Sequence, residues 1–533
     1  MFFPTLLHNF LTRSAGLYPD KTALVCDENR LTYKALDRLS GQLCYAFLDM
    51  GVNRQDRIVI FLDNSVESVI SLYGILKAGC AYITVNGSMK ARQLNYILRD
   101  SGARMLITHV DKARVAEDAV AGLDTACKVL WIGKTDGIPG KLSSISCEWD
   151  AVFSNVNQDE KQSVSNRKDQ PLADKTGQNC IDLDLASLIY TSGSTADPKG
   201  VMSSHRNVIS AAQSIIQYLE NRSDDIIIDV LPLSFDYGLY QVIMSVIFGG
   251  TVVLEKNFLF LHKVLKTIEK ERVTGFPIVP TIVAMLLGMR DLKKYDFNSL
   301  RYMTNTGAAL PVEHIRRIRT LFPHIKFYSM FGLTECKRVC YLPPEELDRR
   351  PSSVGKAMPN CEVFILDENG NEVAPGEVGE LVVRGSNVMR GYWNAPELTA
   401  KTYRPGRFPD EKVLYSGDYF RKDEEGFLYF LGRKDDMIKS KGERVSPKEV
   451  ENTICGIEGV AEAAVIGVPD EILGMAIKAF VVPVKGSKLT DKTVLKHCLN
   501  NLETFKVPKY VILINSLPRT PNGKIDKKAL AKE

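Results

Sequence analysis

The 533-residue chain lacks the marks of several protein classes. Its eleven cysteines contain no CxxC pair, and although Cys336 and Cys340 lie close together, no further Cys or His completes a metal-binding set. The first fourteen residues have no basic segment or small-residue cleavage site, so no secretory signal is expected. The most apolar stretch, Val242–Leu254, is interrupted by Gly249 and Gly250 and is too short to cross a bilayer. We therefore expect a cytoplasmic protein with reduced thiols and no membrane partner.

The chain also has little excess of charge. Charged residues make up 25% of the sequence and the formal net charge is +4, which is ordinary for a soluble protein and gives no argument for a nucleic-acid partner. Hydrophobic residues make up 45%. A chain of this length can bury sizeable cores and is too long for one typical domain.

Short β-rich runs alternate with amphipathic stretches over the first four-fifths of the chain. This alternation predicts an α/β fold in which mostly parallel sheets are packed with helices. Helices are expected at residues 67–77 and 261–271. Strands are expected at residues 57–62, 104–109, 128–133, 185–191, 225–232 and 251–255.

The pattern changes near Gly432–Asp436. After it, a smaller α+β unit is expected, with helices from Ser446 and over Leu489–Leu502 and strands around residues 463–468 and 478–484. We predict an N-terminal core domain over residues 1–432, a hinge over 433–436 and a mobile C-terminal domain over 437–533, which has a normal domain size. The polar stretch Asn155–Asn179 is expected to be a surface loop.

The strongest motif is Tyr190–Gly200, YTSGSTADPKG, which directly follows an expected strand. Glycines and small hydroxyl residues let the backbone approach a phosphate, and Lys199 adds a positive charge. Gly200 stands where a Walker motif has Ser or Thr, which argues against an ordinary P-loop ATPase or kinase. The alternative for the motif taken alone is a Ser/Gly-rich turn.

This segment resembles the phosphate loop of the adenylate-forming superfamily, which comprises acyl-CoA synthetases, luciferases and the adenylation domains of nonribosomal peptide synthetases. Further matches occur in the expected order along nearly the whole chain. The resemblance implies binding of ATP with Mg²⁺. It assigns the ATP phosphates to Thr191, Ser192, Gly193, Ser194, Thr195 and Lys199.

The adenine and metal sites follow from two more segments. Asn305–Ala309 resembles the segment that lines the adenine site, which assigns Gly307, Ala308 and Ala309 to the nucleotide. Phe331–Glu335 resembles the aromatic-Gly-x-Thr-Glu motif of the family. The resemblance implies that Phe331 stacks on adenine beside Gly332, that Thr334 contacts phosphate, and that Glu335 holds Mg²⁺, for which a carboxylate oxygen is suited.

The remaining matches lie toward the end of the chain. Tyr415–Asp418 resembles the motif whose aspartate accepts from both ribose hydroxyls, and a carboxylate has two oxygens for two donors. By resemblance, Arg433 contacts ribose, Asp435 is the hinge, Gly442 lets a thiol arm pass and Lys524 contacts the acid and the α-phosphate. A non-catalytic scaffold should have lost Glu335, Asp418 or Lys524, and all three are present.

The expected reaction has two steps and needs no general base, because a carboxylate with a pKa near 4 is already ionised at neutral pH. Catalysis is expected to rest on positioning and on electrostatic stabilisation at the α-phosphorus. In the second step a thiol attacks the acyl-AMP after the small domain rotates. The residues assigned to catalysis are Lys524, Thr191, Lys199, Thr334, Asp435 and Gly442.

Asp236 points to the class of acid. It lies in LPLSFDYG, where amino-acid adenylation domains carry Phe-Asp and the aspartate pairs with the α-ammonium of the substrate. A buried ammonium needs such a partner. The alternative is an aspartate that caps the following helix.

A substrate pocket is carried over from the family. Its wall is expected to be small and mostly apolar, with Arg338 as a departure that points away or pairs with an acid. Gly332–Arg338 and Tyr341–Pro344 resemble stand-alone L-proline adenylating enzymes of the anatoxin-pathway type, although the physical argument does not separate proline from valine or alanine. The lining residues are Asp236, Tyr237, Tyr240, Pro277, Thr304, Thr306, Met330, Arg338 and Val339.

The thiol acceptor has two candidates. The sequence stops soon after Lys524 with no carrier domain, so we expect a separate phosphopantetheinylated carrier protein as partner, with coenzyme A as the second choice. The alternative function is an acyl-CoA or acyl-carrier-protein ligase for a carboxylic acid without an amine.

Overall fold

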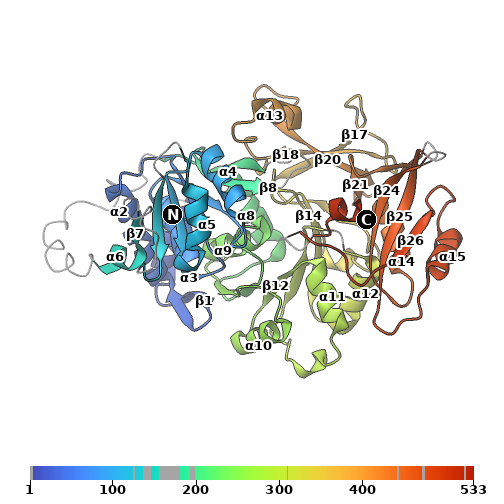
Figure 1. Ribbon diagram of the computed structural model, residues 1–533, viewed down its shortest axis with the longest axis horizontal. Coiled ribbons are helices and arrows are strands. Elements are labelled where there is room, and N and C mark those ends of the chain that lie inside the picture. Colours follow the sequence, from blue (N-terminus) through green and yellow to red (C-terminus); the bar gives the residue numbers. More distant parts are fainter. Residues whose placement is uncertain are drawn as a thin grey trace. The chain divides into compact units, whose positions relative to one another are not determined.

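A computed structural model describes residues 4–123, 127–135, 146–154, 180–191, 198–308, 310–440, 443–470, 474–520 and 524–532. The chain divides into two compact units (Figure 1). The first comprises Met1–Thr274, Thr334–Lys337 and Gly385–Arg404, and the second comprises Gly275–Leu333, Arg338–Arg384 and Pro405–Glu533. The expected surface loop Asn155–Asn179 lies outside the described residues.

A seven-stranded sheet in the order β7-β6-β5-β3-β4-β8-β9 forms one layer of the first unit. Its strands pair in parallel except β8 and β9, which form an antiparallel pair. The central strands are buried along almost their whole length, as parallel sheets covered on both faces require. The strands are β3 (Arg57–Phe61), β4 (Ala81–Thr84), β5 (Met105–His109), β6 (Lys128–Ile132), β7 (Ser146–Glu148), β8 (Leu185–Thr191) and β9 (Lys199–Ser204).

A second group of strands in this unit has the order β10-β11-β1-β2. β10, β11 and β1 are parallel, and β2 is antiparallel to β1. The six strands expected from the sequence are confirmed, with ends shifted by up to three residues. The bounds of this group are β1 (Thr22–Cys26), β2 (Asn29–Thr32), β10 (Ile226–Asp229) and β11 (Thr251–Leu254).

Helices cover these strands, and local signals fix their ends. For the expected helix 67–77, Ser65 caps the first turn by accepting from the Ser68 amide, and Glu67 and Lys77 lie at the ends where the helix dipole favours their charges. The helices are α1 (Leu7–Leu17), α2 (Tyr33–Asp49), α3 (Val66–Lys77), α4 (Ala91–Ser101), α5 (Ala113–Val120), α6 (Trp149–Ser154), α8 (His205–Leu219), α9 (Asp236–Phe248), α10 (Leu261–Glu271) and α13 (Pro396–Thr402). None of the described helices is long and apolar enough to cross a bilayer.

The second unit begins with parallel strands β12, β13 and β14, continued by antiparallel β15 and β16. A neighbouring antiparallel sheet has the order β17-β18-β20, with β21 paired to β20. The elements are β12 (Gly275–Ile278), α11 (Pro280–Gly288), β13 (Tyr302–Asn305), α12 (Val312–Leu321), β14 (Lys326–Phe331), β15 (Cys340–Leu342), β16 (Lys356–Ala357), β17 (Cys361–Leu366), β18 (Gly379–Gly385), β19 (Tyr403–Pro405), β20 (Lys412–Lys422) and β21 (Leu428–Arg433), with short 3₁₀ helices at Val110–Lys112, Leu292–Lys294 and Pro344–Glu346 along the chain.

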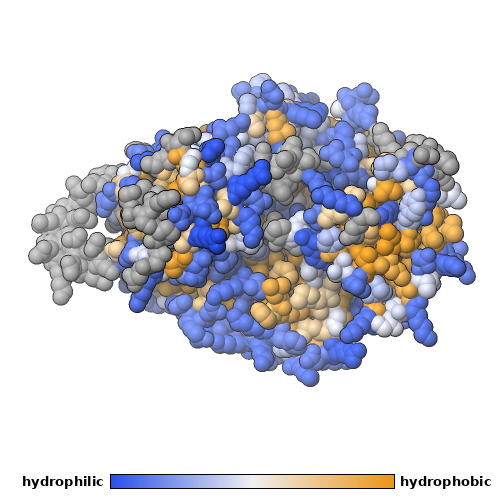
Figure 2. All heavy atoms as spheres, viewed as in Figure 1, coloured by the Kyte–Doolittle hydropathy of each residue, from blue (hydrophilic) through white to orange (hydrophobic). Residues whose placement is uncertain are grey.

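The C-terminal residues of the second unit carry a sheet of their own, in the order β23-β22-β25-β24 with β26 parallel to β25. Separate apolar clusters pack on this sheet, one around Val450, Val465 and Val481 and another around Phe480 and Leu530. In Figure 2 apolar side chains gather where β24 to β26 lie. The elements are β22 (Ile438–Ser440), β23 (Glu443–Val445), α14 (Pro447–Cys455), β24 (Val460–Asp470), β25 (Gly474–Pro483), α15 (Asp491–Asn501), β26 (Tyr510–Leu513) and α16 (Lys527–Leu530).

The expected elements of this C-terminal part are confirmed. Ser446 caps α14 by accepting from the Glu449 amide, and Pro447 occupies the first helical position, where its missing N–H costs nothing. The expected strands lie within β24 and β25, and the expected helix over Leu489–Leu502 is α15. The domain boundaries at residues 432 and 436 stay a prediction.

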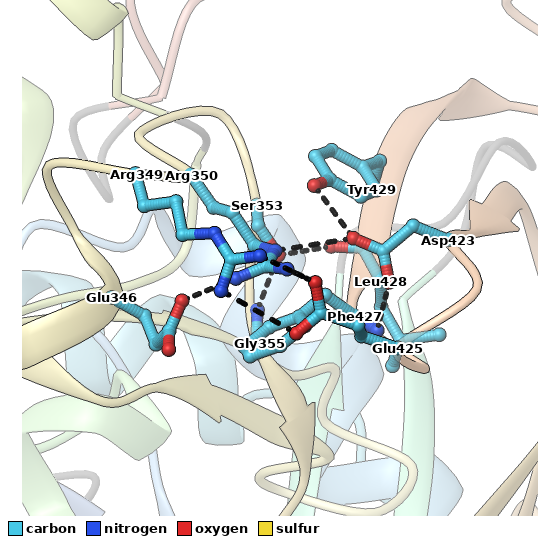
Figure 3. A network of polar contacts seen from close by, with 10 residues as sticks. All are labelled: Glu346, Arg349, Arg350, Ser353, Gly355, Asp423, Glu425, Phe427, Leu428 and Tyr429. Atoms are coloured by element: carbon cyan, nitrogen blue, oxygen red, sulfur yellow. Dashed lines mark hydrogen bonds and ion pairs between the residues drawn. The ribbon is translucent and has the colours of Figure 1, made fainter.

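A polar network around Arg350 holds the β20–β21 hairpin to the segment that follows β15 (Figure 3). The guanidinium is buried, forms ion pairs with Glu346, Asp423 and Glu425, and lies 4.0 Å from the centroid of the Phe427 ring. Burial would raise the pKa of Asp423, but hydrogen bonds from the Phe427 amide, the Tyr429 hydroxyl and Arg350 bring it below its ordinary value of 3.8. The network therefore favours the charged carboxylate.

Backbone pairing completes this attachment. The Val354 amide donates to Leu428 O, and the Leu428 amide donates back to Gly355 O at 2.8 Å. Gly355 has φ +87°, and a Cβ there would lie 1.7 Å from the Tyr341 carbonyl oxygen, so only glycine fits.

We predict that Arg350→Met lowers Tm by several degrees at pH 7, because it removes the buried guanidinium that the half-buried carboxylates of Glu346 and Asp423 and the exposed carboxylate of Glu425 share. Arg349→Met is the matched control, since Arg349 pairs with Glu425 from an exposed position and such pairs contribute little. The measurement is thermal unfolding of both variants from pH 7 to pH 3.

The pH dependence has a defined sign. The pKa of Asp423 is lower in the folded protein than its ordinary value of 3.8. The charged carboxylate therefore contributes its full share to the free energy of unfolding above pH 3.8. This contribution is lost as the pH falls through the lower pKa of the folded state. The difference in Tm between wild type and Arg350→Met should therefore shrink in acid. Equal Tm losses for both arginine variants at pH 7 would contradict a special role for Arg350.

Candidate active site

The two ends of the predicted phosphate loop lie side by side. Thr191 ends β8, Lys199 begins β9, and the two residues are direct partners in the antiparallel pairing. Next to them, the Tyr190 hydroxyl donates to the Asp100 carboxylate at 2.6 Å, and burial raises the pKa of Tyr190. Four of the residues assigned to phosphate, Ser192, Gly193, Ser194 and Thr195, lie outside the described residues.

The start of α9 carries the predicted substrate residues of the first unit. Asp236 is the first helical residue, and Tyr237 and Tyr240 are buried on the same helix. The carboxylate oxygen Oδ2 of Asp236 lies 3.8 Å from Nζ of Lys337, whose side chain is 3% exposed. That ammonium also lies 4.8 Å from the centroid of the Tyr240 ring, within the range of a cation–π contact.

Asp236 is not the cap of α9. The N-cap position belongs to Phe235, and Asp236 follows it inside the helix, which excludes the capping role considered above as an alternative. An acidic residue in a first turn still interacts favourably with the helix dipole. The carboxylate itself is 13% exposed and is paired with Lys337.

Glu335, the predicted metal ligand, is held by a tyrosine. The Tyr392 hydroxyl donates to Glu335 Oε1 at 2.7 Å, and the Met389 amide donates to the Glu335 carbonyl oxygen at 2.9 Å. Tyr403 lies nearby, and burial together with the Glu335 charge raises the pKa of its hydroxyl. Thr334 stands in the same turn.

These contacts fit a nucleotide-borne Mg²⁺. Among the described residues no group of three or more His, Cys, Asp or Glu side chains could hold a metal ion. Mg²⁺ with a nucleotide needs only one or two carboxylates besides phosphate oxygens and water, and Glu335 would supply such an oxygen.

The second unit holds the remaining pocket residues, all of them buried. Pro277 and Thr304 are direct partners on β12 and β13, Met330 lies on β14, and the Val339 amide donates to the Phe331 carbonyl oxygen at 3.0 Å. Gly307 follows β13 with φ +84°, a left-handed conformation that suits glycine, and Ala308 follows it. Ala309 lies outside the described residues.

Arg338 contacts another residue of the predicted pocket wall. Its guanidinium is buried, and NH1 donates to the Thr306 hydroxyl at 2.6 Å. The predicted lining of the second unit therefore includes a cation bound to a pocket threonine, and it is more polar than the expected apolar wall.

Phe331 lies in an aromatic cluster. Its ring centroid is 4.9 Å from that of Phe420 on β20 and 5.6 Å from that of Phe430 on β21, the latter pair being stacked at 27°. Such contacts fix the plane of the ring, which is the requirement for stacking on a flat base. Gly332 follows directly, beyond the end of β14.

Asp418 and Arg433, both assigned to ribose, are partners across β20 and β21. Arg433 Nε donates to Asp418 Oδ1 at 3.1 Å, and Asp418 is buried while Arg433 is mostly exposed. Ser416, two residues before Asp418 on β20, donates to the Leu381 carbonyl oxygen at 2.7 Å. Burial of Asp418 is therefore compensated by a cation on the neighbouring strand.

The predicted hinge is an exposed turn between β21 and β22. Asp435 lies within it, and the amides of Asp436 and Met437 both donate to the Arg433 carbonyl oxygen at 3.0 Å. Gly442, assigned to the thiol step, lies outside the described residues. The segment 437–440 returns at once to sheet structure as β22.

Lys524 is exposed, and the residue after it, Ile525, forms an isolated antiparallel bridge with Arg519. The Thr520 amide donates to the Lys524 carbonyl oxygen at 2.8 Å, and Arg519 donates to the Thr281 hydroxyl on α11 at 2.7 Å and to Glu462 on β24 at 2.5 Å. Arg519 thus ties the segment preceding Lys524 to two elements of the second unit.

Sequence reasoning missed Lys337 and Tyr392. The only signal for Lys337 was two consecutive cations, Lys337 and Arg338, directly after Thr334-Glu335-Cys336, and nothing in the pattern says that both are buried. The contact of Tyr392 with Glu335 joins residues far apart in the chain.

Comparison with known proteins places the chain in a family. The model of the AMP-binding enzymes matches residues 11–393, and the model of the AMP-binding enzyme C-terminal domain matches residues 449–524. Among curated relatives, a long-chain-fatty-acid–CoA ligase of Bacillus subtilis is 32% identical over 99% of this chain and 94% of its own. Bacitracin synthase 3 of Bacillus licheniformis is 28% identical over 98% of this chain, which spans only 8% of that protein.

Solved structures give the same result. The anthranilate CoA ligase AuaEII in complex with anthranoyl-AMP has a TM-score of 0.87 and 27% identity, covering 99% of this chain and 98% of that one. ATP-bound MatB from Rhodopseudomonas palustris has a TM-score of 0.85 and 28% identity, covering 98% of each chain. The α/β fold with a small C-terminal domain is thereby confirmed. The chain belongs to the family of AMP-binding enzymes and is an ATP-dependent, AMP-forming ligase that joins a carboxylic acid to a thiol.

Proposed function

We propose that this ligase adenylates an amino acid, L-proline, and transfers the prolyl group to the phosphopantetheine thiol of a separate carrier protein. The observation that carries the proposal is the mostly buried carboxylate of Asp236 at the start of α9, beside Tyr237 and Tyr240. A carboxylate in such surroundings favours a cationic partner, and the ammonium of an amino acid supplies one. The resemblance to proline-activating enzymes names the amino acid.

The contact with Lys337 leaves room for this role. At 3.8 Å the pair lies beyond direct hydrogen-bond distance, so the oxygens of Asp236 can still accept from a substrate. Tyr237 and Tyr240 are buried on α9, and their aromatic rings would suit packing against an aliphatic ring.

A second candidate function is supported by the same contact. Lys337 already supplies a counter-charge to Asp236, so the carboxylate of Asp236 does not require an ammonium from the substrate. Acyl-CoA ligases among the relatives, including the fatty-acid enzyme of Bacillus subtilis, support this candidate.

The proposed chemistry uses the substrate carboxylate as nucleophile at the α-phosphorus, with pyrophosphate as the leaving group. Thr191, Thr334 and Lys199 position the phosphates, Lys524 contacts the acid and the α-phosphate, and Asp418 and Arg433 hold the ribose. Mg²⁺ at Glu335, when bound, would neutralise phosphate charge. No residue need remove a proton from the nucleophile.

The test of the proposal is ATP–pyrophosphate exchange against a panel of amino acids and of fatty and aryl acids. We expect strong exchange with L-proline and weak exchange with valine and alanine. Exchange with a fatty or aryl acid and with no amino acid would support the second candidate and overturn the first.

Tyr392→Phe should raise the Mg²⁺ concentration needed for half-maximal exchange several-fold, because Glu335 loses the hydroxyl that holds one oxygen in place. Binding of Mn²⁺ to the ATP complex, followed by electron paramagnetic resonance, should weaken in parallel. Tyr403→Phe is the control, since the buried Tyr403 hydroxyl makes no hydrogen bond to a described residue. Equal effects of both variants would show that Tyr392 does not act through Glu335.

Asp435→Pro should leave exchange within about twofold of wild type and reduce thioester formation by more than about tenfold, because proline fixes φ in the turn that must rotate. Thioester formation is measured with a phosphopantetheinylated carrier and with coenzyme A. Faster acylation of the carrier supports the proposed acceptor, and faster acylation of coenzyme A would replace it. Equal loss of both half-reactions would reject the hinge.

A further inference from the structure

Lys337 is a buried cation to which neither the family resemblance nor the comparisons assign a role. Its side chain is 3% exposed, although lysine is almost never fully buried unless it is paired. Its φ is +64°, a left-handed conformation that is strained for a residue with a Cβ and is maintained only where the surrounding structure requires it. The chain therefore fixes this ammonium in place.

The surroundings of the ammonium define what it can bind. Nζ lies 3.8 Å from Asp236 Oδ2 and 4.8 Å from the centroid of the Tyr240 ring, so an acid and an aromatic face lie beside it. The distance to Asp236 gives charge compensation but exceeds a direct hydrogen bond. A lysine ammonium has three N–H donors and a carboxylate has two acceptor oxygens, so both members of the pair can also serve a third group.

We propose that Asp236 and Lys337 form one recognition pair for the zwitterion of an α-amino acid. Asp236 accepts from the ammonium of the substrate, and Lys337 donates to the carboxylate of the same molecule. The proposal rests on the proposed amino-acid function and deepens it. It makes Lys337 a substrate-binding residue in addition to Lys524.

Charge balance is the reason for this pairing. The pair is neutral, and a zwitterion is neutral, so their complex buries no uncompensated charge. An acid without an amine would add a second negative charge beside one cation, and an amine without an acid would add a second positive charge beside one anion. The pair therefore selects against both.

Geometry gives the same answer. In an α-amino acid one carbon atom separates the ammonium from the carboxylate, and the two charges of the pair are 3.8 Å apart. Each charge of the substrate can thus face the opposite charge of the protein. A longer spacing between amine and acid would align poorly with the pair.

The alternative is that Lys337 only compensates Asp236 and never contacts the substrate. Its removal would then leave Asp236 more negative and free for an ammonium. That alternative predicts that loss of Lys337 strengthens the binding of amines and does not weaken the binding of acids. The proposal and the alternative therefore predict opposite changes in the affinity for L-proline when Lys337 is removed, so an experiment can separate them.

The experiment uses three ligands of the same ring size: L-proline, cyclopentanecarboxylate, which lacks the amine, and pyrrolidine, which lacks the acid. Dissociation constants are measured by isothermal titration of the full chain in the presence of a non-hydrolysable ATP analogue. The variants are Lys337→Met and Asp236→Asn. Lys77→Met is the matched control, because Lys77 is another buried lysine paired with an aspartate, Asp37, outside the predicted site.

Lys337→Met should raise the dissociation constants of L-proline and cyclopentanecarboxylate by about tenfold each, which is the usual effect of losing a charge-assisted hydrogen bond. It should not weaken the binding of pyrrolidine. Asp236→Asn should weaken the binding of L-proline and of pyrrolidine. It should leave the dissociation constant of cyclopentanecarboxylate within about twofold of the wild-type value. Lys77→Met should leave the ranking of the three ligands unchanged.

The proposal is overturned if Lys337→Met binds cyclopentanecarboxylate as well as wild type does, or binds L-proline more tightly. Should a single variant unfold, the double variant Asp236→Asn/Lys337→Met removes both buried charges together, and loss of preference for L-proline over both analogues is then the expected result. A wild-type protein that binds no amino acid and exchanges none would instead reject the proposed function, which is a different outcome.

Discussion

The burial of charge is the constraint on which the arrangement of the predicted site depends. A charge removed from water needs a partner, and both units supply partners to charged residues of the predicted site. In the first unit Asp236 has Lys337 and Glu335 has the Tyr392 hydroxyl. In the second unit Asp418 has Arg433, and Arg338 has the Thr306 hydroxyl. These contacts fix the side chains before any ligand binds.

Fixed partners suit a reaction that depends on positioning more than on proton transfer. The nucleophile of an AMP-forming ligase arrives already ionised, so the protein need only hold it and stabilise charge at phosphorus. Residues assigned to phosphate and ribose binding lie on paired strands. Thr191 and Lys199 close a hairpin, and Asp418 and Arg433 face each other across β20 and β21. The Arg350 network secures that second hairpin, so a residue remote from the chemistry helps to set its geometry.

The fold followed from the sequence to a large extent, because the apolar runs of buried parallel strands and the caps of helices are local signals. The helix at Leu261–Glu271 matched at both ends, and Ser446 and Pro447 marked the start of α14. The partners of the site residues did not follow from it. Lys337 is as polar as any surface lysine, and only the tertiary structure buries it under Tyr240 beside Asp236. Arg338 was a recognised departure from an apolar pocket, but its bond to Thr306 depends on how two distant segments meet.

The central claim is that this chain activates the carboxylate of an amino acid by forming a bond from a carboxylate oxygen to the α-phosphorus of ATP. The most direct measurement uses L-proline labelled with ¹⁸O in both carboxylate oxygens, with a thiol acceptor and mass spectrometry of the nucleotide product. The account predicts AMP carrying one ¹⁸O atom for each thioester formed, since one oxygen of the acid leaves with the phosphate. Unlabelled AMP, or ADP as the product, would contradict it.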